Sequence, residues 1–314
     1  MAEDLINDNN LMKAAWFYYK ENMNQSEIAE QLGMSRTKVV RLLEKARTEG
    51  IVQIHIKRLE GNCLNVEQEI INQFNLKNAF IIPTPVHDEG LVDSLAKAAA
   101  QFLQSRLQPN DLIGIGWGRT VAQTIDRLDI RWDQITSVVT LTGGIHFYLQ
   151  NRQGQDGRME KFNEIHVIPA PMLASSTELA EIFLKEPAIK QILDFIHLSA
   201  YSLVGIGGVY SDATIIQEES LSLNELAYIK KQEAAGDILG QFFNAEGELL
   251  DLPHHHRYIG ISLDKLKETQ HVIGVAGGQN KVEAIYGALK GGYIHTLVTD
   301  EQTALALLGR EGDQ

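Results

Sequence analysis

The N-terminal part of the fold is decided by residues 24–46, NQSEIAEQLGMSRTKVVRLLEKA. Asn24 is a favourable helix N-cap, and Glu27, three positions later, can complete a capping box with it. Gly33 suits the left-handed conformation that ends a helix and starts a tight turn. Ser35 offers a second N-cap directly after that turn. The stretch therefore predicts two helices separated by a glycine turn.

The second of these helices, which we expect over residues 36–48, has two chemically different sides. At about 100° per residue its apolar side chains share one stripe, as an amphipathic helix requires, and the opposite side is polar and basic. The stripe consists of Val39, Leu42, Leu43 and Ala46. An earlier segment, LMKAAWFYYKE (11–21), has its own helical apolar face. This layout is typical of an all-α helix-turn-helix module, whose second helix enters the major groove of DNA.

A helix in the groove would use its outer side chains in two ways. We expect Arg36, Thr37 and Arg41 to read base edges and Val40 to touch a thymine methyl group. Phosphate contacts, which give affinity without sequence information, are expected from Lys38, Lys45 and Arg47. The candidate DNA-binding residues are Ser35, Arg36, Thr37, Lys38, Val40, Arg41 and Lys45. The competing interpretation is a basic, solvated helix in another kind of α-helical module.

The charge of the chain is unevenly distributed. The net charge is −13 over 314 residues, which by itself argues against nucleic acid as a partner. Residues 35–58, however, carry seven Lys and Arg against two acidic residues, whereas residues 59–314 carry 19 basic and 33 acidic residues. DNA responds to charge within a Debye length of about 8 Å, so the charge of this local basic segment, and not the net charge of the chain, determines whether DNA can bind. An acidic body can stay off the duplex while this segment binds it.

Length and composition indicate a soluble protein of roughly two domains. The single cysteine, Cys63, excludes an intramolecular disulfide framework and fits a reducing compartment. The first ten residues, MAEDLINDNN, are unlike a signal peptide, and no apolar run approaches the ~18 residues of a membrane span. We therefore expect a cytoplasmic protein without membrane contact. The segment RLEGN (58–62) is the linker candidate and divides a helix-turn-helix domain, 1–58, from a second domain, 59–314.

The second domain alternates short apolar runs with helical stretches, which predicts an α/β fold with a largely parallel sheet covered on both faces. Several runs end in small residues just before a helix, in loops 116–120, 142–144, 174–176, 205–208 and 277–281. In open α/β sheets, loops at the carboxyl ends of the strands form the ligand crevice, and helix N-termini present N–H groups to anions. Glycine also ends strands for steric reasons alone. Five such loops together predict an anionic ligand.

The loops do not match a nucleotide-binding fingerprint. Residues 114–118, GIGWG, lack the G-x-G-x-x-G spacing, and no Walker lysine motif occurs. Lys281 follows a double glycine and can meet a phosphate or a sugar oxygen, unless it is a solvated helix lysine. Asp237 can accept hydrogen bonds from sugar hydroxyls, or it can cap a helix running through Phe242. The three histidines at 254–256 lack a flanking carboxylate that would complete a tetrahedral set. We expect neither a metal nor another cofactor.

These residues, taken together, resemble a known family over nearly the full length. The chain is similar to the SorC-type sugar-responsive regulators, which include DeoR-related sugar-binding proteins, and within them to the LsrR-like branch. The motifs that carry the resemblance, in chain order, are WFYY (16–19), NQSEIAEQLGMSRTKVVRLLEKA (24–46), GIGWG (114–118), LTGG (141–144), IPAPMLASS (168–176), VGIGG (204–208), GDILGQFF (236–243), GVAGGQNKVEAI (274–285) and GGYIHTLVTDEQTA (291–304).

The resemblance implies a Rossmann-like effector domain, similar to glucosamine-6-phosphate deaminase and ribose-phosphate isomerase, that binds a ligand instead of transforming it. It also implies a homo-oligomer, a tetramer by our expectation, and an effector that is a phosphorylated sugar, a polyol phosphate or a phosphorylated autoinducer. The residues matching the family's ligand loops are Gly116, Trp117, Thr142, Gly143, Gly144, Ser175, Ser176, Asp237 and Lys281. Residues 145–162 follow no family pattern, which leaves the identity of the effector open.

Three functions compete on these observations. The first is a DNA-binding transcriptional regulator, expected to repress a carbohydrate or polyol operon under allosteric control by the effector. The second is a sugar-phosphate isomerase or deaminase, which needs a carboxylate base beside a proton relay. Asp237 is the one carboxylate that a motif places near the loops, and no histidine pairs with it convincingly. The third is an α/β binding protein whose N-terminal module docks protein partners. We expect the regulator and not an enzyme.

Overall fold

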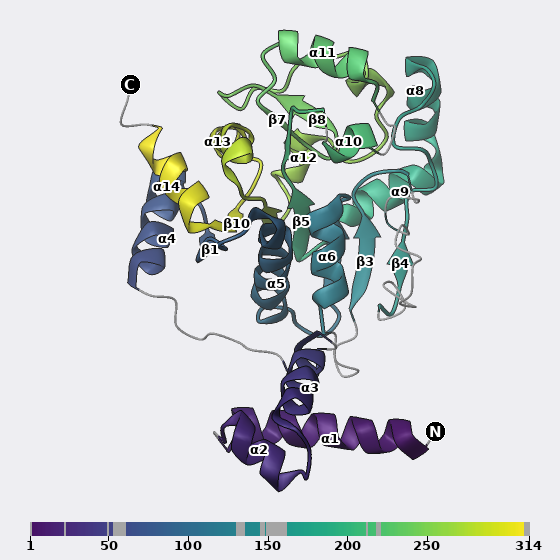
Figure 1. Ribbon diagram of the computed structural model, residues 1–314. Helices are drawn as coiled ribbons and strands as arrows, with labels where there is room; N and C mark the ends of the chain where they lie inside the picture. The colour runs from purple at the N-terminus through teal and green to yellow at the C-terminus, as the bar shows by residue number, and fades with distance from the viewer. Residues whose placement is uncertain are drawn as a thin grey trace. The chain divides into compact units, whose positions relative to one another are not determined.

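The computed structural model of the protein is shown in Figure 1. It describes residues 2–21, 23–48, 50–52, 61–129, 136–144, 148, 162–211, 213–217 and 221–310. The chain divides into two compact units, Met1–Arg58 and Leu59–Gln314. Most of the expected linker, residues 58–60, and nearly all of the unmatched segment 145–162 lie outside the described residues. Within the described part, none of the helices combines the length and apolar character needed to cross a membrane.

The N-terminal unit consists of α1 (Ala2–Tyr19), α2 (Gln25–Gln31) and α3 (Arg36–Thr48). Asn24 caps α2 by accepting from the backbone N–H of Glu27 at 3.0 Å, and the Glu27 carboxylate accepts from the Asn24 N–H at 2.7 Å. Gly33 takes a φ of +62°, and the Ser35 hydroxyl oxygen accepts from the Lys38 N–H at 3.3 Å. The predicted capping box, glycine turn and second cap are therefore confirmed.

The inner face of α3 closes a small separate core. Its predicted stripe is buried and packs with residues of α1 and α2, of which Leu11, Ala14 and Ile28 are at most 1% exposed. Each large apolar side chain buried in this way contributes about 1.5–3 kcal/mol relative to exposure. The helix-turn-helix shape thus depends on three helices that share one apolar centre.

The second unit is built on a seven-stranded sheet in the order β1-β10-β9-β5-β2-β3-β4, in which every pairing is parallel. Its strands are β1 (Asn78–Ile82), β2 (Leu112–Ile115), β3 (Ser137–Thr140), β4 (Ile165–His166), β5 (Tyr201–Gly205), β9 (Val272–Val275) and β10 (Thr296–Asp300). Every residue of β2, β9 and β10 is buried. Since successive side chains of a strand point to opposite faces, these central strands are covered on both sides, which confirms the predicted α/β architecture.

Helices occupy the connections between the strands. Among the described residues of this unit, the α-helices are α4 (Gly61–Phe74), α5 (Leu91–Gln104), α6 (Arg119–Arg127), α8 (Thr177–Lys185), α9 (Pro187–Ile196), α10 (Thr214–Gln217), α11 (Leu223–Lys231), α12 (Leu263–Leu266), α13 (Val282–Lys290) and α14 (Glu301–Gly309). Helices α5 and α6 pack side by side, and α4 packs against α14 and β1 (Figure 1).

A second, three-stranded sheet lies beyond the carboxyl ends of the main sheet's strands (Figure 1). It consists of β6 (Gly207–Gly208), β7 (Gly236–Ile238) and β8 (Gln241–Phe243), all antiparallel. Strands β7 and β8 form a hairpin whose two turn residues, Leu239 and Gly240, have φ values of +58° and +80°. Two positive φ angles are the signature of a type I′ turn. The helix that Asp237 was alternatively expected to cap is therefore absent, and Asp237 lies in a hairpin strand.

Candidate functional site

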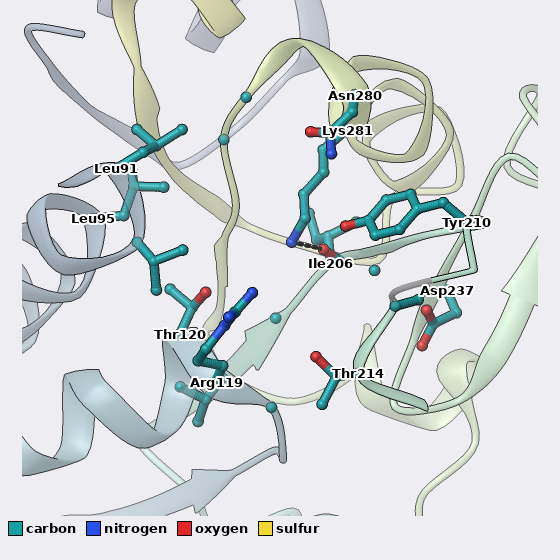
Figure 2. Close-up of a pocket in the computed structure, with 18 of the residues that line it drawn as sticks. Leu91, Leu95, Arg119, Thr120, Ile206, Tyr210, Thr214, Asp237, Asn280 and Lys281 are labelled. Atoms are coloured by element: carbon teal, nitrogen blue, oxygen red, sulfur yellow. Dashed lines mark hydrogen bonds between the residues drawn. The ribbon is translucent and has the colours of Figure 1, made fainter. Parts of the chain in front are cut away.

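A pocket of about 550 Å³ lies at the carboxyl ends of β2, β5, β9 and β10 (Figure 2). This is the edge at which open parallel sheets bind ligands. Its walls come from the loops that follow these strands, from the first turns of α5 and α6, and from β7 of the small sheet. The polar side chains on the walls are Thr84, Arg119, Thr120, Tyr210, Thr214, Asp237, Gln279, Asn280, Lys281, Asp300 and Gln302.

The first anion-binding element of the pocket is the start of α6. Gly118 precedes this helix with a φ of +116°, and no side chain caps the helix N-terminus. The first N–H groups of a helix have no partner within the helix, and the helix dipole favours negative charge there. Arg119 and Thr120 begin the helix, and the Arg119 side chain extends into the pocket (Figure 2). A guanidinium beside free N–H donors makes this end of the pocket suitable for a phosphate.

The second loop of the pocket follows β9 and is held by a buried carboxylate. The N–H of Gly278 donates to Asp300 Oδ1 at 3.2 Å and to the Thr303 hydroxyl at 2.8 Å. Asp300 is 1% exposed, and its Oδ2 accepts from the Thr84 hydroxyl at 2.8 Å. Asp300 therefore ties the glycine loop to the segment after β1 and to α14. The loop presents Asn280 and Lys281 to the cavity (Figure 2).

The polar floor of the pocket contains Asp237 and Lys281. The Lys281 ammonium donates to the Ile206 carbonyl at 3.0 Å, and burial lowers its pKa against the opposing effect of Asp237. Asp237 is 6% exposed and accepts from the Gly240 N–H through Oδ2 at 2.9 Å. Burial raises the pKa of Asp237 to about 6, although the Gly240 N–H and Lys281 favour its ionised form. Oδ1 packs over Gly207, where an added Cβ would come within 2.0 Å of it.

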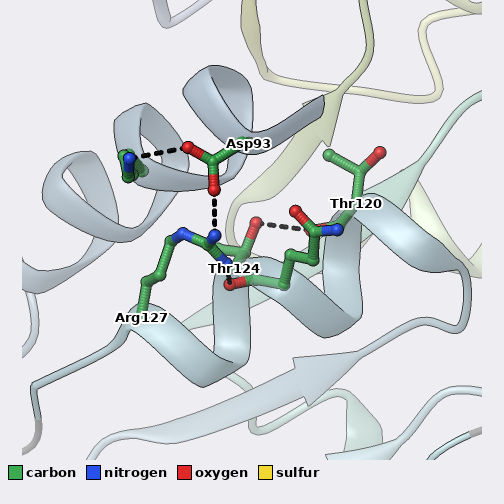
Figure 3. A network of polar contacts seen from close by, with 6 residues as sticks. Asp93, Thr120, Thr124 and Arg127 are labelled. Atoms are coloured by element: carbon green, nitrogen blue, oxygen red, sulfur yellow. Dashed lines mark hydrogen bonds and ion pairs between the residues drawn. The ribbon is translucent and has the colours of Figure 1, made fainter. Parts of the chain in front are cut away.

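Apolar side chains and an ion-pair network complete the wall formed by α5 and α6. Leu91, Val92 and Leu95 of α5 line the cavity. Asp93 forms ion pairs with Arg127 of α6 and, at 2.6 Å, with Lys97 (Figure 3). Burial opposes ionisation of Asp93, but these two cations hold its pKa below the usual value. The network fixes the two pocket helices against each other.

Of the effector residues expected from the family resemblance, Trp117, Asp237 and Lys281 line this pocket. Gly116 lies behind its wall, where a Cβ would come within 2.9 Å of Leu239 Cδ2. Ser176 caps α8 by accepting from the Leu179 N–H at 3.2 Å, and its exposed neighbour Ser175 also lies away from the cavity.

The loop 142–144 is engaged with other parts of the unit instead of the pocket. The N–H groups of Gly143 and Gly144 donate to the carbonyls of Ile259 and Ala170 at 2.9 and 2.8 Å. The Thr142 hydroxyl lies 2.9 Å from the hydroxyl of buried Tyr148. The part in effector binding that the resemblance gives to residues 142–144, 175 and 176 stays a prediction.

Several pocket side chains were not singled out from the sequence. Arg119 and Asn280 belong to the glycine loops 116–120 and 277–281, so their position after a strand-end glycine was the available signal. Tyr210 and Thr214 follow β6 and reach the cavity through the tertiary fold, without a local motif that marks them (Figure 2).

The N-terminal unit carries the second candidate site on the outer side of α3. All seven candidate DNA-binding residues are exposed, while the stripe on the inner side is buried. Val40 is 39% exposed, which fits a contact to a thymine methyl group. The seven exposed residues are Ser35, Arg36, Thr37, Lys38, Val40, Arg41 and Lys45.

Comparison with known proteins identifies the family. Residues 59–309 match the family model described as "Putative sugar-binding domain". The chain is 39% identical over 312 residues to the transcriptional regulator LsrR of Escherichia coli (strain K12), covering 98% of this chain and 96% of that protein. It is 36% identical over 304 residues to LsrR of Enterobacter sp. (strain 638), covering 96% and 93%.

A solved structure extends the similarity to the whole architecture. The full-length sorbitol operon regulator SorC from Klebsiella pneumoniae matches with a TM-score of 0.74 and 29% identity, covering 95% of this chain and 97% of that one. These relatives are regulators, which supports the regulator hypothesis over the sugar-phosphate enzyme. The chain is a sugar-responsive transcriptional regulator of the SorC type and belongs with the LsrR proteins.

Proposed function

We propose that the protein represses a carbohydrate or polyol operon and that a phosphorylated sugar, polyol or autoinducer in the pocket controls its affinity for operator DNA. The observation that carries this proposal is the pairing, within one cavity, of an uncapped helix N-terminus beside Arg119 with the polar floor at Asp237 and Lys281. A volume of about 550 Å³ is in the usual range of small-molecule sites.

The two ends of the pocket suggest how the effector is oriented. Its phosphate would accept from the first N–H groups of α6 and from Arg119, while its hydroxyls would donate to Asp237 Oδ1 and accept from Lys281. The C–H faces of the sugar would contact Leu91 and Leu95 on the opposite wall. A neutral sugar lacks the group that the α6 end favours, so we expect discrimination against unphosphorylated sugars.

DNA binding is the proposed role of the outer face of α3. Regulators with this motif bind as symmetric oligomers to two half-sites about one helical turn apart, or multiples of it. We propose a homotetramer that acts in the cytoplasm, with operator and effector coupled through the linker and the oligomer interfaces. A coupling of about 1–3 kcal/mol would change operator affinity about 5–150-fold.

Fluorescence anisotropy with the full-length protein tests the DNA site. An operator duplex is first selected from a randomised pool, and its affinity is then measured over a range of salt concentrations. Arg41→Ala is expected to weaken specific binding about 5–150-fold and to relax specificity, because a bidentate base contact contributes about 1–3 kcal/mol. Lys13→Ala, which removes the same charge from an exposed position of α1, is the control and should retain specificity. Equal behaviour of the two variants would contradict a reading role for α3.

The same assay tests the effector by adding ribose 5-phosphate, glucosamine 6-phosphate and glycerol 3-phosphate, each paired with its unphosphorylated counterpart. The proposal expects at least one phosphorylated compound to change operator affinity and to raise the melting temperature, since a ligand that binds the folded state stabilises it. If a broader panel of sugar phosphates changed neither quantity, the proposed effector class would be wrong.

Gly207→Ala is expected to abolish the effector response while leaving operator binding intact. A methyl group at this position would overlap Oδ1 of Asp237, the carboxylate oxygen proposed to accept from the effector. Gly309→Ala, at the end of α14 and outside the pocket lining, is the matched control, because nothing lies within 4 Å of a methyl group at that position. Titration calorimetry, with a sugar phosphate that changes operator affinity in the preceding assay, measures the effector affinity of each variant. An unchanged effector affinity in Gly207→Ala would remove Asp237 from the proposed site.

A further inference from the structure

One contact in the N-terminal unit joins the end of α1 to the end of α3. The Arg47 Nε–H donates to the Tyr19 hydroxyl oxygen at 2.6 Å, and the guanidinium carbon lies 5.9 Å from the centre of the Tyr19 ring. Tyr19 is half-buried beside Tyr18, whereas Arg47 is exposed. Within the described residues this is the hydrogen bond that the Arg47 side chain makes, and it raises the pKa of Arg47.

The geometry of this hydrogen bond leaves one edge of the guanidinium unused. A guanidinium has five N–H donors in one plane, and Nε contributes one of them. The two terminal nitrogens form a complete fork on the far edge, which matches two oxygens of a phosphate. Since the hydrogen bond to Tyr19 already restricts the Arg47 side chain, binding a phosphate would cost less side-chain entropy than it costs a free arginine.

The position of Arg47 on α3 places this fork beside the DNA-reading face. At about 100° per residue, Arg47 lies about 20° around the helix from Arg36 and from Val40. It lies about 80° from Thr37 and about 120° from Arg41, so it flanks the reading face on one side. Along the axis it lies about 16 Å beyond Arg36, at a rise of about 1.5 Å per residue. The major groove is about 12 Å wide, so when the start of α3 is at the bases, its far end is at the groove rim, near the phosphates.

We propose that Tyr19 is a positioning residue that holds Arg47 as a preformed phosphate clamp at the rim of the operator groove. This inference rests on the proposed DNA-binding function. It assigns a DNA role to α1, which carries none of the candidate reading residues. Because the clamp binds phosphate, it increases affinity for every duplex and adds no sequence preference.

The test compares Tyr19→Phe, Arg47→Ala and the double variant by anisotropy on the selected operator and on a scrambled duplex. Tyr19→Phe keeps the ring and is expected to lower the affinity for both duplexes about 3–10-fold. The slope of log affinity against log salt concentration (the salt slope) should be retained, because the charge of Arg47 remains. Arg47→Ala should lower the affinity for both duplexes further and reduce the magnitude of the salt slope by about one. The double variant should match Arg47→Ala. Tyr18→Phe, a neighbouring half-buried tyrosine, is the control and should bind as the wild type does.

Arg47→Lys distinguishes the effect of the guanidinium fork from the effect of the positive charge, because lysine keeps the charge but lacks the fork. This variant should bind DNA about as weakly as Tyr19→Phe, with the salt slope unchanged. Circular dichroism spectra and melting curves of all variants identify effects that come only from folding. Wild-type affinity in Tyr19→Phe, or additive losses in the double variant, would overturn the clamp. If the wild-type protein bound no duplex at all, the proposed function itself would fail, whereas specific binding that requires Arg41 but is indifferent to Tyr19 overturns this inference alone.

Discussion

Asp237→Asn is expected to make the free protein more stable and to weaken effector binding. Burial raises the pKa of Asp237 from 3.8 to about 6, so keeping the carboxylate ionised above pH 6 costs up to about 3 kcal/mol. Asparagine removes this cost, and its amide oxygen can still accept from the Gly240 N–H. We expect the free energy of unfolding at pH 8 to rise by about 1–3 kcal/mol in chemical denaturation without effector.

The effector should bind this variant at least about tenfold more weakly, because a hydrogen bond to a charged acceptor contributes about 1.5–3 kcal/mol. The pH dependence gives a second readout. In the wild type, affinity should fall below pH 6, by at most about tenfold per pH unit, since protonation turns Asp237 from a charged acceptor into a weaker neutral one. A phosphate also titrates near pH 6, so the difference between wild type and Asp237→Asn isolates Asp237. Identical pH profiles would show that Asp237 does not meet the ligand.

Stability is expected to fall steeply as the pH drops from about 6.5 to 4, because buried His254 and half-buried His255 are neutral in the folded protein. Burial lowers the pKa of His254 and His255 to about 4. The Phe242 N–H donates to His255 Nε2 at 2.9 Å, and His255 Nδ1 lies 2.8 Å from the Leu250 carbonyl, which fits a neutral ring protonated at Nδ1. In this pH range these histidines are protonated in the unfolded chain but stay neutral in the folded protein. Each of them therefore lowers the free energy of unfolding by up to about 1.4 kcal/mol for each pH unit of acidification.

Thermal melting between pH 4.5 and 8 measures this effect. His254 is 4% exposed and its Nε2 has no hydrogen-bond partner within the described residues, so His254→Leu should lose no more than the backbone hydrogen bond at Gly240, about 1 kcal/mol at pH 8, and be less sensitive to acid. His256→Gln is the control, since His256 is exposed. Asp237 titrates in the opposite direction but contributes equally to both variants. If His254→Leu lost stability with acid as fast as His256→Gln, the assignment of His254 as a neutral buried group would be wrong.

The features that the sequence predicted are those whose physical cause is local. The capping box at Asn24 and the turn at Gly33 depend on neighbours within four residues, and the buried stripe of α3 depends only on helical period. The pocket loops 116–120 and 277–281 could be found because parallel strands place their carboxyl ends at one edge, whatever their order in the sheet.

The sequence alone thus determined the two kinds of module, the exposed polar face of α3 and two of the loops that form the pocket. Tertiary structure decided which side chains meet. Asp237 belongs to a hairpin strand instead of a helix, and it lines the same pocket as Lys281, which lies 44 positions later in the chain. Tyr19 reaches Arg47 across 28 positions. Such contacts follow from the packing of whole elements, and no local propensity or period encodes which of them will touch.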